Sequence, residues 1–464
     1  MLVGRIVPVA PDPLALARGL VARGHRHVAL LHAADPEGPA WARASFLAAD
    51  PVGESDALDP FGEEGAGIGG ERASGRERAG TERVGEAWLA RAPRWIGVIP
   101  FEARRGLERE GWRPVETRAA PMIARPRWFR YAAVAWFDRG AGRVLVVGES
   151  VAAAEGFARA LVRAEGASIS GDPRARAGRA ARVEVEDEEP PARHAERIAR
   201  ARELILAGDL YQVNLARRLR VVLREGSALA LHERLAGAAH APLSAYLELG
   251  DVTVMSTSPE LLLAAEAAPG GGFGELATEP IKGTRPRGAH AAADLALARE
   301  LDADPKERAE LAMIVDVERN DLGRVAQVGS VRIAAAPRVV THRTIHHRVA
   351  LVTARARPGL SREEVLRAIV PSGSVTGAPK VRAMEVIASL EARRRGLYTG
   401  GLGFVRHDGG VVLAMAIRTV VLGAADGEGE YWTGGGIVAD SDPAREVEET
   451  RWKALQLMRA AGST

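Results

Sequence analysis

Carboxylates at helical spacing are the first residues in this sequence whose types and positions suggest chemistry. Glu307 and Glu310 are three residues apart, and Glu446 and Glu449 repeat that spacing near the end of the chain. Residues three apart share one face of a helix. Two such helices facing each other would offer a hard cation such as Mg²⁺ the oxygen ligands that it prefers. A solvated helix face explains either pair taken alone.

Two single cations stand in unusual surroundings. Arg418 interrupts the apolar run 414–421, where a guanidinium needs an acidic partner or binds a carboxylate ligand. A structural salt bridge is equally compatible with this pattern. Lys282 lies beside a glycine in the segment 278–286. Such a lysine is normally exposed, but a desolvated amine in a cleft can attack an electrophilic carbon.

Two glycine-rich segments allow a ligand to approach the backbone. Residues 371–380 contain Gly373 and Gly377 and lead into a predicted helix, whose N-terminus favours an anion. Three glycines, 434–436, follow the predicted strand 430–433. Tight turns explain both segments as well, and the spacing of a phosphate-binding loop is absent from residues 371–380.

Three parts of the chain must position these residues. Residues 1–165 are predicted to mix strands with helices, 166–191 to be a linker because the segment is polar and ends in two prolines, and 192–464 to form a second unit. Residues 53–85 are rich in Gly, Glu, Arg and Ser and are predicted to be a surface loop. In the first part the predicted elements are strands 27–32, 95–100 and 144–148 and a helix at 157–162.

The second unit combines strand runs with helices but lacks a regular strand–helix alternation, which indicates an α+β architecture. Its predicted strands are 211–221, 244–249, 252–257, 331–333 and 411–421, and its predicted helices are 192–207, 306–317, 361–370, 380–394 and 443–460.

Composition excludes several classes of protein. The 464 residues are 47% hydrophobic without an apolar run long enough to span a membrane, and the first residues lack the pattern of a secretory signal, so we expect a cytoplasmic protein with no membrane partner. The net charge of +3 is not clustered, and aromatic residues are only 5%, so nucleic acid is not an expected partner. The absence of cysteine excludes thiolate chemistry in this chain.

An ordered set of segments resembles the chorismate-binding enzyme family over residues 190–460. The segments are 208–215, 258–260, 278–286, 316–324, 373–380, Arg418 and 434–453, and residues 41–51 resemble an early strand of the family's N-terminal domain. The resemblance implies two stacked, largely antiparallel β-sheets surrounded by helices, with the N-terminal region interlocked around the catalytic half. It also implies Mg²⁺ held by Glu310 and Glu449, with Glu307 and Glu446 supporting through water.

The same resemblance assigns the substrate pocket. It implies that Arg418 and Tyr398 hold the enolpyruvyl carboxylate of chorismate and that His347 lies beside the substrate. The remaining pocket residues that it implies are Lys453, Gly283, Thr376, Gly434 and Gly436.

A few positions favour one branch of this family. Gln212 stands where isochorismate synthases carry a lysine base. Residues 280–284 resemble the segment Pro-Ile-Ala-Gly-Thr of anthranilate synthases, but Lys282 replaces its alanine, and a lysine at this position is typical of aminodeoxychorismate synthases. The resemblance implies that Glu260 is the general acid on the C4 hydroxyl and that Lys282 forms a covalent adduct before ammonia enters at C4. Anthranilate synthase chemistry is the alternative, and a non-catalytic chorismate-binding protein is a more distant one.

Ammonia must come from elsewhere, because the family's glutaminases use a cysteine that this chain lacks. The resemblance therefore implies a separate glutamine amidotransferase subunit as partner. Because the chain ends soon after Lys453, a fused lyase is not expected, and formation of 4-aminobenzoate, towards folate, would need another protein.

Overall fold

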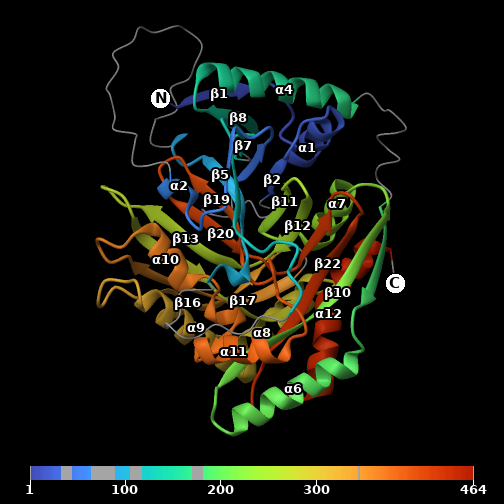
Figure 1. Cartoon of the computed structure of the whole chain (residues 1–464), viewed down its shortest axis with the longest axis vertical. Coiled ribbons are helices and arrows are strands. Elements are labelled where there is room, and N and C mark those ends of the chain that lie inside the picture. The colour runs from blue at the N-terminus through green and yellow to red at the C-terminus, as the bar shows by residue number, and fades with distance from the viewer. Residues whose placement is uncertain are drawn as a thin grey trace.

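A computed structural model describes residues 2–32, 44–63, 89–104, 118–138, 140–169, 181–342 and 345–462. Within these residues two large sheets pack face to face, and helices cover their outer faces (Figure 1). Every strand pairing between named strands of the described chain is antiparallel. This architecture confirms the predicted α+β class and the two stacked sheets.

The first sheet has twelve strands in the described chain. Their order is β1 (Val3–Val7), β8 (Arg143–Gly148), β7 (Ala133–Asp138), β3 (Ser45–Ala48), β2 (Ala29–His32), β11 (Leu243–Glu248), β12 (Val252–Ser258), β21 (Thr419–Gly423), β22 (Glu428–Ile437), β10 (Gln212–Glu225) and β18 (Gly377–Ala378), with β9 (Arg182–Asp187) paired to β10.

The second sheet has ten strands in the same described ranges. Their order is β15 (Ile281–Pro286), β17 (Ile345–Arg355), β14 (Phe273–Glu279), β13 (Leu261–Ala267), β20 (Val411–Met415), β19 (Gly401–Arg406), β5 (Pro93–Ile99), β6 (Arg127–Arg130) and β4 (Gly53–Ser55), with β16 (Arg332–Thr341) paired to β17.

The N-terminal region contributes strands to both sheets. β2 pairs with β11 in the first sheet, and β5 pairs with β19 in the second, so the N-terminal strands form one end of each sheet and the later strands form the rest (Figure 1). Apolar side chains from both sheets, including Phe46, Val98, Val254 and Leu402, form one core between them. Because this core cannot form without the first 150 residues, the predicted interlocking is confirmed.

Helices cover the outer faces. Those of the described chain are α1 (Pro13–Ala22), α2 (Pro60–Glu63), α4 (Val151–Ile169), α6 (Pro191–Leu206), α7 (Ala228–Ala239), α8 (Ala291–Ala303), α9 (Pro305–Gly323), α10 (Arg362–Ile369), α11 (Lys380–Leu390) and α12 (Pro443–Ala461), with short 3₁₀ turns at Phe101–Arg104 and Gly373–Val375. In Figure 1, α4 and α1 lie at one end of the molecule and α6 and α11 at the other. None of the described helices is long and apolar enough to cross a membrane.

The two helices that carry the carboxylate pairs begin in the same way. Asp304 caps α9 and accepts hydrogen bonds from the backbone of Lys306 and Glu307, and Asp442 caps α12 and accepts one from Arg445. A proline follows each cap, where its fixed φ suits the first helical turn and its missing N–H costs nothing. The Asp-Pro starts therefore fix where the first turns place their glutamates.

Several predicted elements differ from the structure. Residues 182–187, assigned to a linker, form β9, because their alternating valines pair with β10. The predicted loop at 53–85 contains β4 and α2, and its residues 64–85 lie outside the described chain. Residues 434–436 belong to β22 and not to a turn after it. The predicted helix 380–394 ends at Leu390. Of the segment 41–51, residues 45–48 form β3, and 41–43 are not described.

We expect Asp442→Ala to lower the free energy of unfolding by about 1 kcal/mol, because the Arg445 N–H loses its side-chain acceptor and the first turn of α12 loses a negative charge. Urea unfolding in Mg²⁺-free buffer measures this. Asp442→Ser keeps an oxygen acceptor and should retain most of the stability. Equal losses in the two variants would contradict the assigned cap.

Candidate active site

Two crossings between the sheets lie side by side and place the central ionisable residues. The chain leaves β12 of the first sheet for β13 of the second at Glu260, and it returns from β20 to β21 at Arg418. Met415 N donates to Glu260 O at 3.0 Å, and Thr257 N donates to Arg418 O at 3.1 Å. These bonds join the two crossings, so the acid and the guanidinium are fixed to one another through the backbone.

Arg418 breaks the run that was predicted as one strand, 411–421. Its φ of +51° lies in the left-handed region, which costs a non-glycine residue on the order of 1–3 kcal/mol. The strand cannot continue through this conformation, so β20 and β21 belong to different sheets. The bend also shapes the candidate site, because it puts the Arg418 side chain near Glu260.

Glu260 is buried, with 7% of its surface exposed. Its Oε1 accepts a hydrogen bond from Ser374 Oγ at 3.2 Å. Burial, and then repulsion by Glu318, raise the pKa of Glu260 to about 7, although Lys282, Ser374 and Arg418 act in the opposite direction. A carboxyl with this pKa holds a proton near neutral pH and can donate it to a leaving group.

Lys282 extends from β15 toward the same place. A Cβ added to Gly436 would lie 3.7 Å from Lys282 Nζ and 2.7 Å from Gln212 Nε2, so the bare backbone of β22 leaves room beside the amine. Lys282 lowers the pKa of both Glu260 and Glu449, so its ammonium lies near both carboxyls. It forms no ion pair or hydrogen bond with the described residues, so the amine is available to a ligand.

The Arg418 guanidinium also lacks a carboxylate partner within the described ranges. Burial lowers its pKa, while Tyr431 and Glu260 oppose that shift. A buried cation without a partner is unfavourable. A planar carboxylate bound through two hydrogen bonds is its natural complement, so this position suits an anionic ligand.

Three buried polar atoms nearby have no hydrogen-bond partner among the described residues: His347 Nε2, Gln212 Nε2 and Asn214 Oδ1. The other ring nitrogen of His347 lies 3.0 Å from Thr284 Oγ1. Burial, followed by the charge of Arg418, lowers the pKa of His347 to about 3, so the imidazole is neutral. Because buried polar groups are normally paired, these atoms are candidates to pair with a polar ligand.

Tyr398 lies against the segment that carries Arg418. Its ring stacks on Trp432, with centroids 5.8 Å apart, and the Arg395 guanidinium lies 5.5 Å from the ring centre. Ile417 packs against this pair. The structure therefore brings Tyr398 to the neighbourhood of Arg418, as the sequence predicts, and holds its ring rigidly.

Two other predicted pocket residues have structural tasks. The Thr376 hydroxyl donates to Ser372 O at 2.9 Å, and the Thr376 carbonyl accepts from Asn214 N at 2.8 Å, so both groups hold the turn against β10. A Cβ on Gly434 would lie 2.4 Å from a carbonyl of β10. The Gly434 carbonyl accepts from Lys453 Nζ at 2.7 Å, which ties α12 to the sheet.

The four predicted metal-binding carboxylates lie in two pairs. Burial, and then repulsion by the neighbouring carboxylate, raises the pKa of Glu307; burial also raises the pKa of Glu446, with Glu449 adding to it. Burial raises the pKa of Glu449 too, but Lys453, which lies 2.7 Å from Glu449 Oε1, outweighs it.

Two ammonium groups stand among these carboxylates. Lys306 forms an ion pair with Glu310 at 3.6 Å and also influences the pKa values of Glu446 and Glu449. This influence shows that the first turns of α9 and α12 are near each other. As arranged here, no three His, Asp or Glu side chains of the described chain converge on one point.

The donors nevertheless fit a hard cation in kind. A Cβ on Gly435 would lie 3.2 Å from Glu446 Oε2 and 3.8 Å from Glu449 Oε1, so the glycine leaves open the space beside these oxygens. Gly283, with φ of +79°, similarly brings bare backbone to Glu307 Oε2, 2.9 Å from its ideal Cβ. Mutual repulsion among carboxylates is what a divalent ion relieves.

Glu318 is the functional candidate that the sequence reasoning missed. It is 1% exposed and accepts hydrogen bonds from Ser372 Oγ, Ser374 N and Thr278 Oγ1. Its position in α9 follows the buried face of Leu311, Ile314 and Val315 at helical spacing. A charged residue at a position where periodicity predicts an apolar one was the signal available in the sequence.

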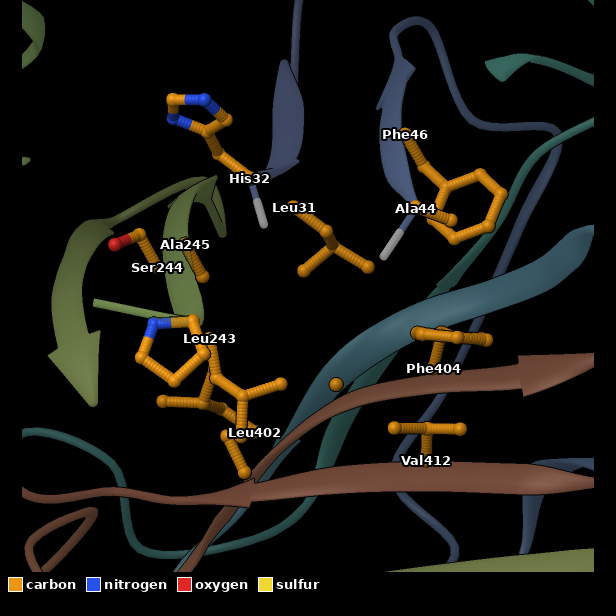
Figure 2. A pocket seen from close by; sticks show the side chains of 13 residues that line it. Leu31, His32, Ala44, Phe46, Leu243, Ser244, Ala245, Leu402, Phe404 and Val412 are labelled. Atoms are coloured by element: carbon orange, nitrogen blue, oxygen red, sulfur yellow. The ribbon is translucent and has the colours of Figure 1, made fainter. Parts of the chain in front are cut away.

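A separate apolar cavity lies between the sheets, away from these residues. It has a volume of about 30 Å³, and Figure 2 shows Leu31, Phe46, Leu402 and Val412 around it. The lining comes from β2, β3, β11, β19 and β20 and includes none of the predicted site residues.

A comparison with known protein families shows to which family this chain belongs. The family described as chorismate binding enzyme matches residues 54–459. The chain belongs to the chorismate-binding enzyme family. The match covers both the catalytic region and most of the N-terminal strands, so membership does not depend on one motif.

Relatives within this family carry two different names. The anthranilate synthase component 1 of Streptomyces coelicolor is 45% identical over 270 residues, or 58% of this chain and 51% of that protein. The aminodeoxychorismate synthase of Streptomyces griseus is 43% identical over 255 residues, or 55% of this chain and 34% of that protein. The aligned region of this chain thus spans about half the length of the first of these curated relatives and about a third of the length of the second.

Solved structures support the fold. Anthranilate synthase component I from Streptococcus pneumoniae TIGR4 superposes with a TM-score of 0.71 at 26% identity, covering 89% of this chain and 91% of that one. The menaquinone-specific isochorismate synthase MenF from Escherichia coli gives the same TM-score at 16% identity, covering 99% and 94%, and shows the fold alone. The chain therefore has an anthranilate synthase component I-like fold.

The raised pKa of Glu260 makes a prediction about stability and pH. The folded protein keeps this proton up to a pH of about 7, whereas the unfolded chain loses it near the ordinary pKa of 4.5. The free energy of unfolding of the wild type should therefore fall as pH rises from 4.5 to about 7. Glu260→Gln should therefore be more stable than the wild type near pH 8, by on the order of 2 kcal/mol, and similar to it near pH 4.5. Urea unfolding at both pH values measures this. A variant that gains nothing at the higher pH would show that Glu260 ionises freely.

Proposed function

We propose that this chain is the aminating subunit of an aminodeoxychorismate synthase, which converts chorismate and ammonia to 4-amino-4-deoxychorismate. The observation that carries the proposal is Lys282. Its amine has no partner among the described residues and lies in the same site as the buried acid Glu260 and the unpaired Arg418. A nucleophile, an acid and an anion-binding group in one buried site are the parts that this reaction needs.

Binding is the first task of the site. Arg418, supported by Tyr398, would hold the enolpyruvyl carboxylate, and Lys453 with the backbone of residues 434–436 would line the ring. His347 is neutral, so it can accept or donate a hydrogen bond to a substrate oxygen without adding charge. The unpartnered atoms of Gln212 and Asn214 supply further polar contacts.

Glu260 and Lys282 would act together in the first chemical step. After the Lys282 ammonium has given a proton to ammonia or solvent, its neutral Nζ forms a bond to ring carbon C2, the ring double bonds shift, and the C4–O bond breaks. Glu260 gives its proton to the departing hydroxyl, which leaves as water. The secondary ammonium formed at the Lys282 nitrogen then releases a proton to solvent and becomes a neutral amine.

Ammonia completes the reaction in a second step. It bonds to C4, the double bonds shift back, and the bond from C2 to the Lys282 nitrogen breaks. A proton passes from the new ammonium to the departing lysine, so Lys282 is free again. Two such displacements place the amine at C4 in place of one direct substitution at that carbon.

A divalent cation is part of the proposal. Glu310 and Glu449 would hold Mg²⁺, with Glu307 and Glu446 supporting it through water, and the ion would neutralise the ring carboxylate of chorismate. Lys306 and Lys453 occupy these carboxylates in the present arrangement, so metal binding would displace their ammonium groups. Because these carboxylates already pair with positively charged groups, a bound cation can take the place of the ammonium groups.

A separate glutamine amidotransferase subunit is the proposed source of ammonia. No cysteine is present in the 464 residues to act as a glutaminase nucleophile. The product would then serve the formation of 4-aminobenzoate in another protein. High ammonium concentrations should replace the partner in an assay.

Anthranilate synthase is the second candidate, and the names of the relatives favour it. The Streptomyces coelicolor protein, 45% identical over its aligned region, carries that name, although relatives with one fold need not share one activity. In this reading Lys282 would not react, and the product would be anthranilate with pyruvate. The position of the amine in the product separates the two candidates.

We expect purified protein with chorismate, Mg²⁺ and ammonium to give a product aminated at C4 that retains the pyruvyl group, identified by mass spectrometry and NMR. Lys282→Ala should lose activity by about a hundredfold or more, because the nucleophile is gone. Lys282→Arg keeps the positive charge near Glu260 and Glu449 but is not nucleophilic, so it should be equally slow. Anthranilate formed at the same rate by all three proteins would reject the proposal.

We expect calorimetric titration to show Mg²⁺ binding that weakens about tenfold or more in Glu310→Gln and Glu449→Gln, since each loses a charged ligand. Glu448→Gln is the matched control, because Glu448 neighbours Glu449 on α12 but pairs with Arg451 at 3.1 Å. Equal weakening in the control, or no binding by the wild type, would place the metal elsewhere or exclude it.

A further inference from the structure

A line of four side-chain oxygens joins Glu260 to a second buried carboxyl, that of Glu318. Glu260 Oε1 accepts from Ser374 Oγ at 3.2 Å, Ser374 Oγ lies 2.9 Å from Ser372 Oγ, and Ser372 Oγ is hydrogen-bonded to Glu318 Oε1. All four residues are less than a tenth exposed. The line therefore runs through protein and not through bulk water.

The number of protons in this line is fixed by its geometry. Its three oxygen-to-oxygen contacts need one proton each, and the two serine hydroxyls supply two. If both carboxyls were ionised, lone pairs would face each other at one contact in a buried place, which is costly. A single carboxylic proton, held by either Glu260 or Glu318, satisfies all three contacts.

We propose that Glu318 is the proton partner of Glu260: the two carboxyls share one proton through Ser372 and Ser374, and Glu318 replaces the proton that Glu260 gives to a leaving group. Glu318 is thus a positioning residue that acts through Glu260 and never touches substrate. The inference rests on the proposed function only in taking Glu260 as the acid.

The transfer balances at each atom. Glu318 passes its proton to Ser372 Oγ, which passes its own hydroxyl proton to Ser374 Oγ, which passes its own to Glu260 Oε1. Both hydroxyls end with one proton, Glu260 is neutral again, and Glu318 is left ionised. The ionised form keeps the hydrogen bonds donated by Ser374 N at 3.3 Å and Thr278 Oγ1 at 3.2 Å.

The surroundings bring the two carboxyls to similar proton affinities. Burial, and then repulsion by Asp321, raise the pKa of Glu318 to about 7, while Ser372 and Lys380 oppose the shift. Glu260 reaches about the same value. The charged groups that face the pair are Asp321 and Lys380 beside Glu318, with Lys380 Nζ 2.5 Å from Asp321 Oδ2, and Lys282 and Arg418 beside Glu260.

The test compares Glu318→Gln with the wild type in the ammonia-dependent reaction from about pH 5.5 to 9. The glutamine amide supplies the third proton of the line without carrying charge, so Glu260 should ionise more readily. We expect the fall of kcat at high pH to move down by about one pH unit. The ratio of variant to wild-type rates should therefore drop as pH rises, and this ratio cancels the changing supply of free ammonia.

Two variants control for other effects. Glu318→Asp keeps an ionisable group and should return the pH profile toward that of the wild type. Asp316→Asn changes an exposed carboxylate on the same helix, paired with Arg319 at 2.7 Å, and should alter neither rate nor profile. Thermal unfolding and chorismate binding, followed by calorimetry, verify that each variant is folded and binds substrate.

A folded, chorismate-binding Glu318→Gln whose rate ratio is flat with pH would overturn the proposal and leave Glu318 a structural residue. If this variant does not fold, Ser372→Ala breaks the line and keeps both carboxyls, and an unchanged rate and profile would overturn the proposal equally. The product is identified in every assay. Anthranilate would reject the proposed function without affecting this test, because either product requires the C4 hydroxyl to leave.

Discussion

The reciprocal pair of backbone hydrogen bonds between the two sheet crossings is the interaction on which the site depends. Met415 N to Glu260 O and Thr257 N to Arg418 O tie together segments that are about 160 residues apart in sequence. They join the two sheets at a place where the chain changes sheet twice. The acid and the guanidinium therefore keep their separation without any direct contact between their side chains.

Charge around Glu260, Lys282 and Arg418 is incompletely compensated by the described residues. Lys282 and Arg418 have no anionic partner in the described chain, and Glu260, whose pKa burial raises to about 7, is only partly ionised at neutral pH. A partly buried cation without an anionic partner lowers the stability of the free protein. Carboxylates of a bound substrate would offset that cost, so the same groups that destabilise the fold provide binding energy.

How far the sequence predicted the structure depended on whether local patterns decide an element. α12 and α6 have clear helical periodicity and were predicted within a residue or two, and β11 and β12 have clear apolar runs. Arg418 could not be placed, because its neighbours all favour a strand and only the meeting of two sheets forces the bend. Acidic residues and prolines around β9 looked like a linker, although β10 supplies the partner that makes it a strand.

The sequence predicted which residues belong to the candidate site but not how they are arranged in space. Resemblance named Lys282, Glu260 and Arg418, and the structure brings these three together. It also gave Thr376 and Gly434 a part in substrate binding, whereas the contacts seen here are structural. Glu318 was passed over because its partners, Ser372 and Ser374, are more than fifty residues away, and only the fold makes them neighbours.

The N-terminal region supplies strands to both sheets, and this affects how the chain folds while it is being synthesised. Trp95 of β5 pairs with Val405 of β19, so the ribosome must add about 310 residues before β5 meets its partner. At about 5–20 residues per second this takes roughly 15–60 s. Meanwhile β5, which is almost wholly apolar on both faces, lacks half of its ladder, and unpaired apolar strands are prone to aggregate. Production of this protein in the cell should therefore depend on chaperones that hold the nascent N-terminal strands.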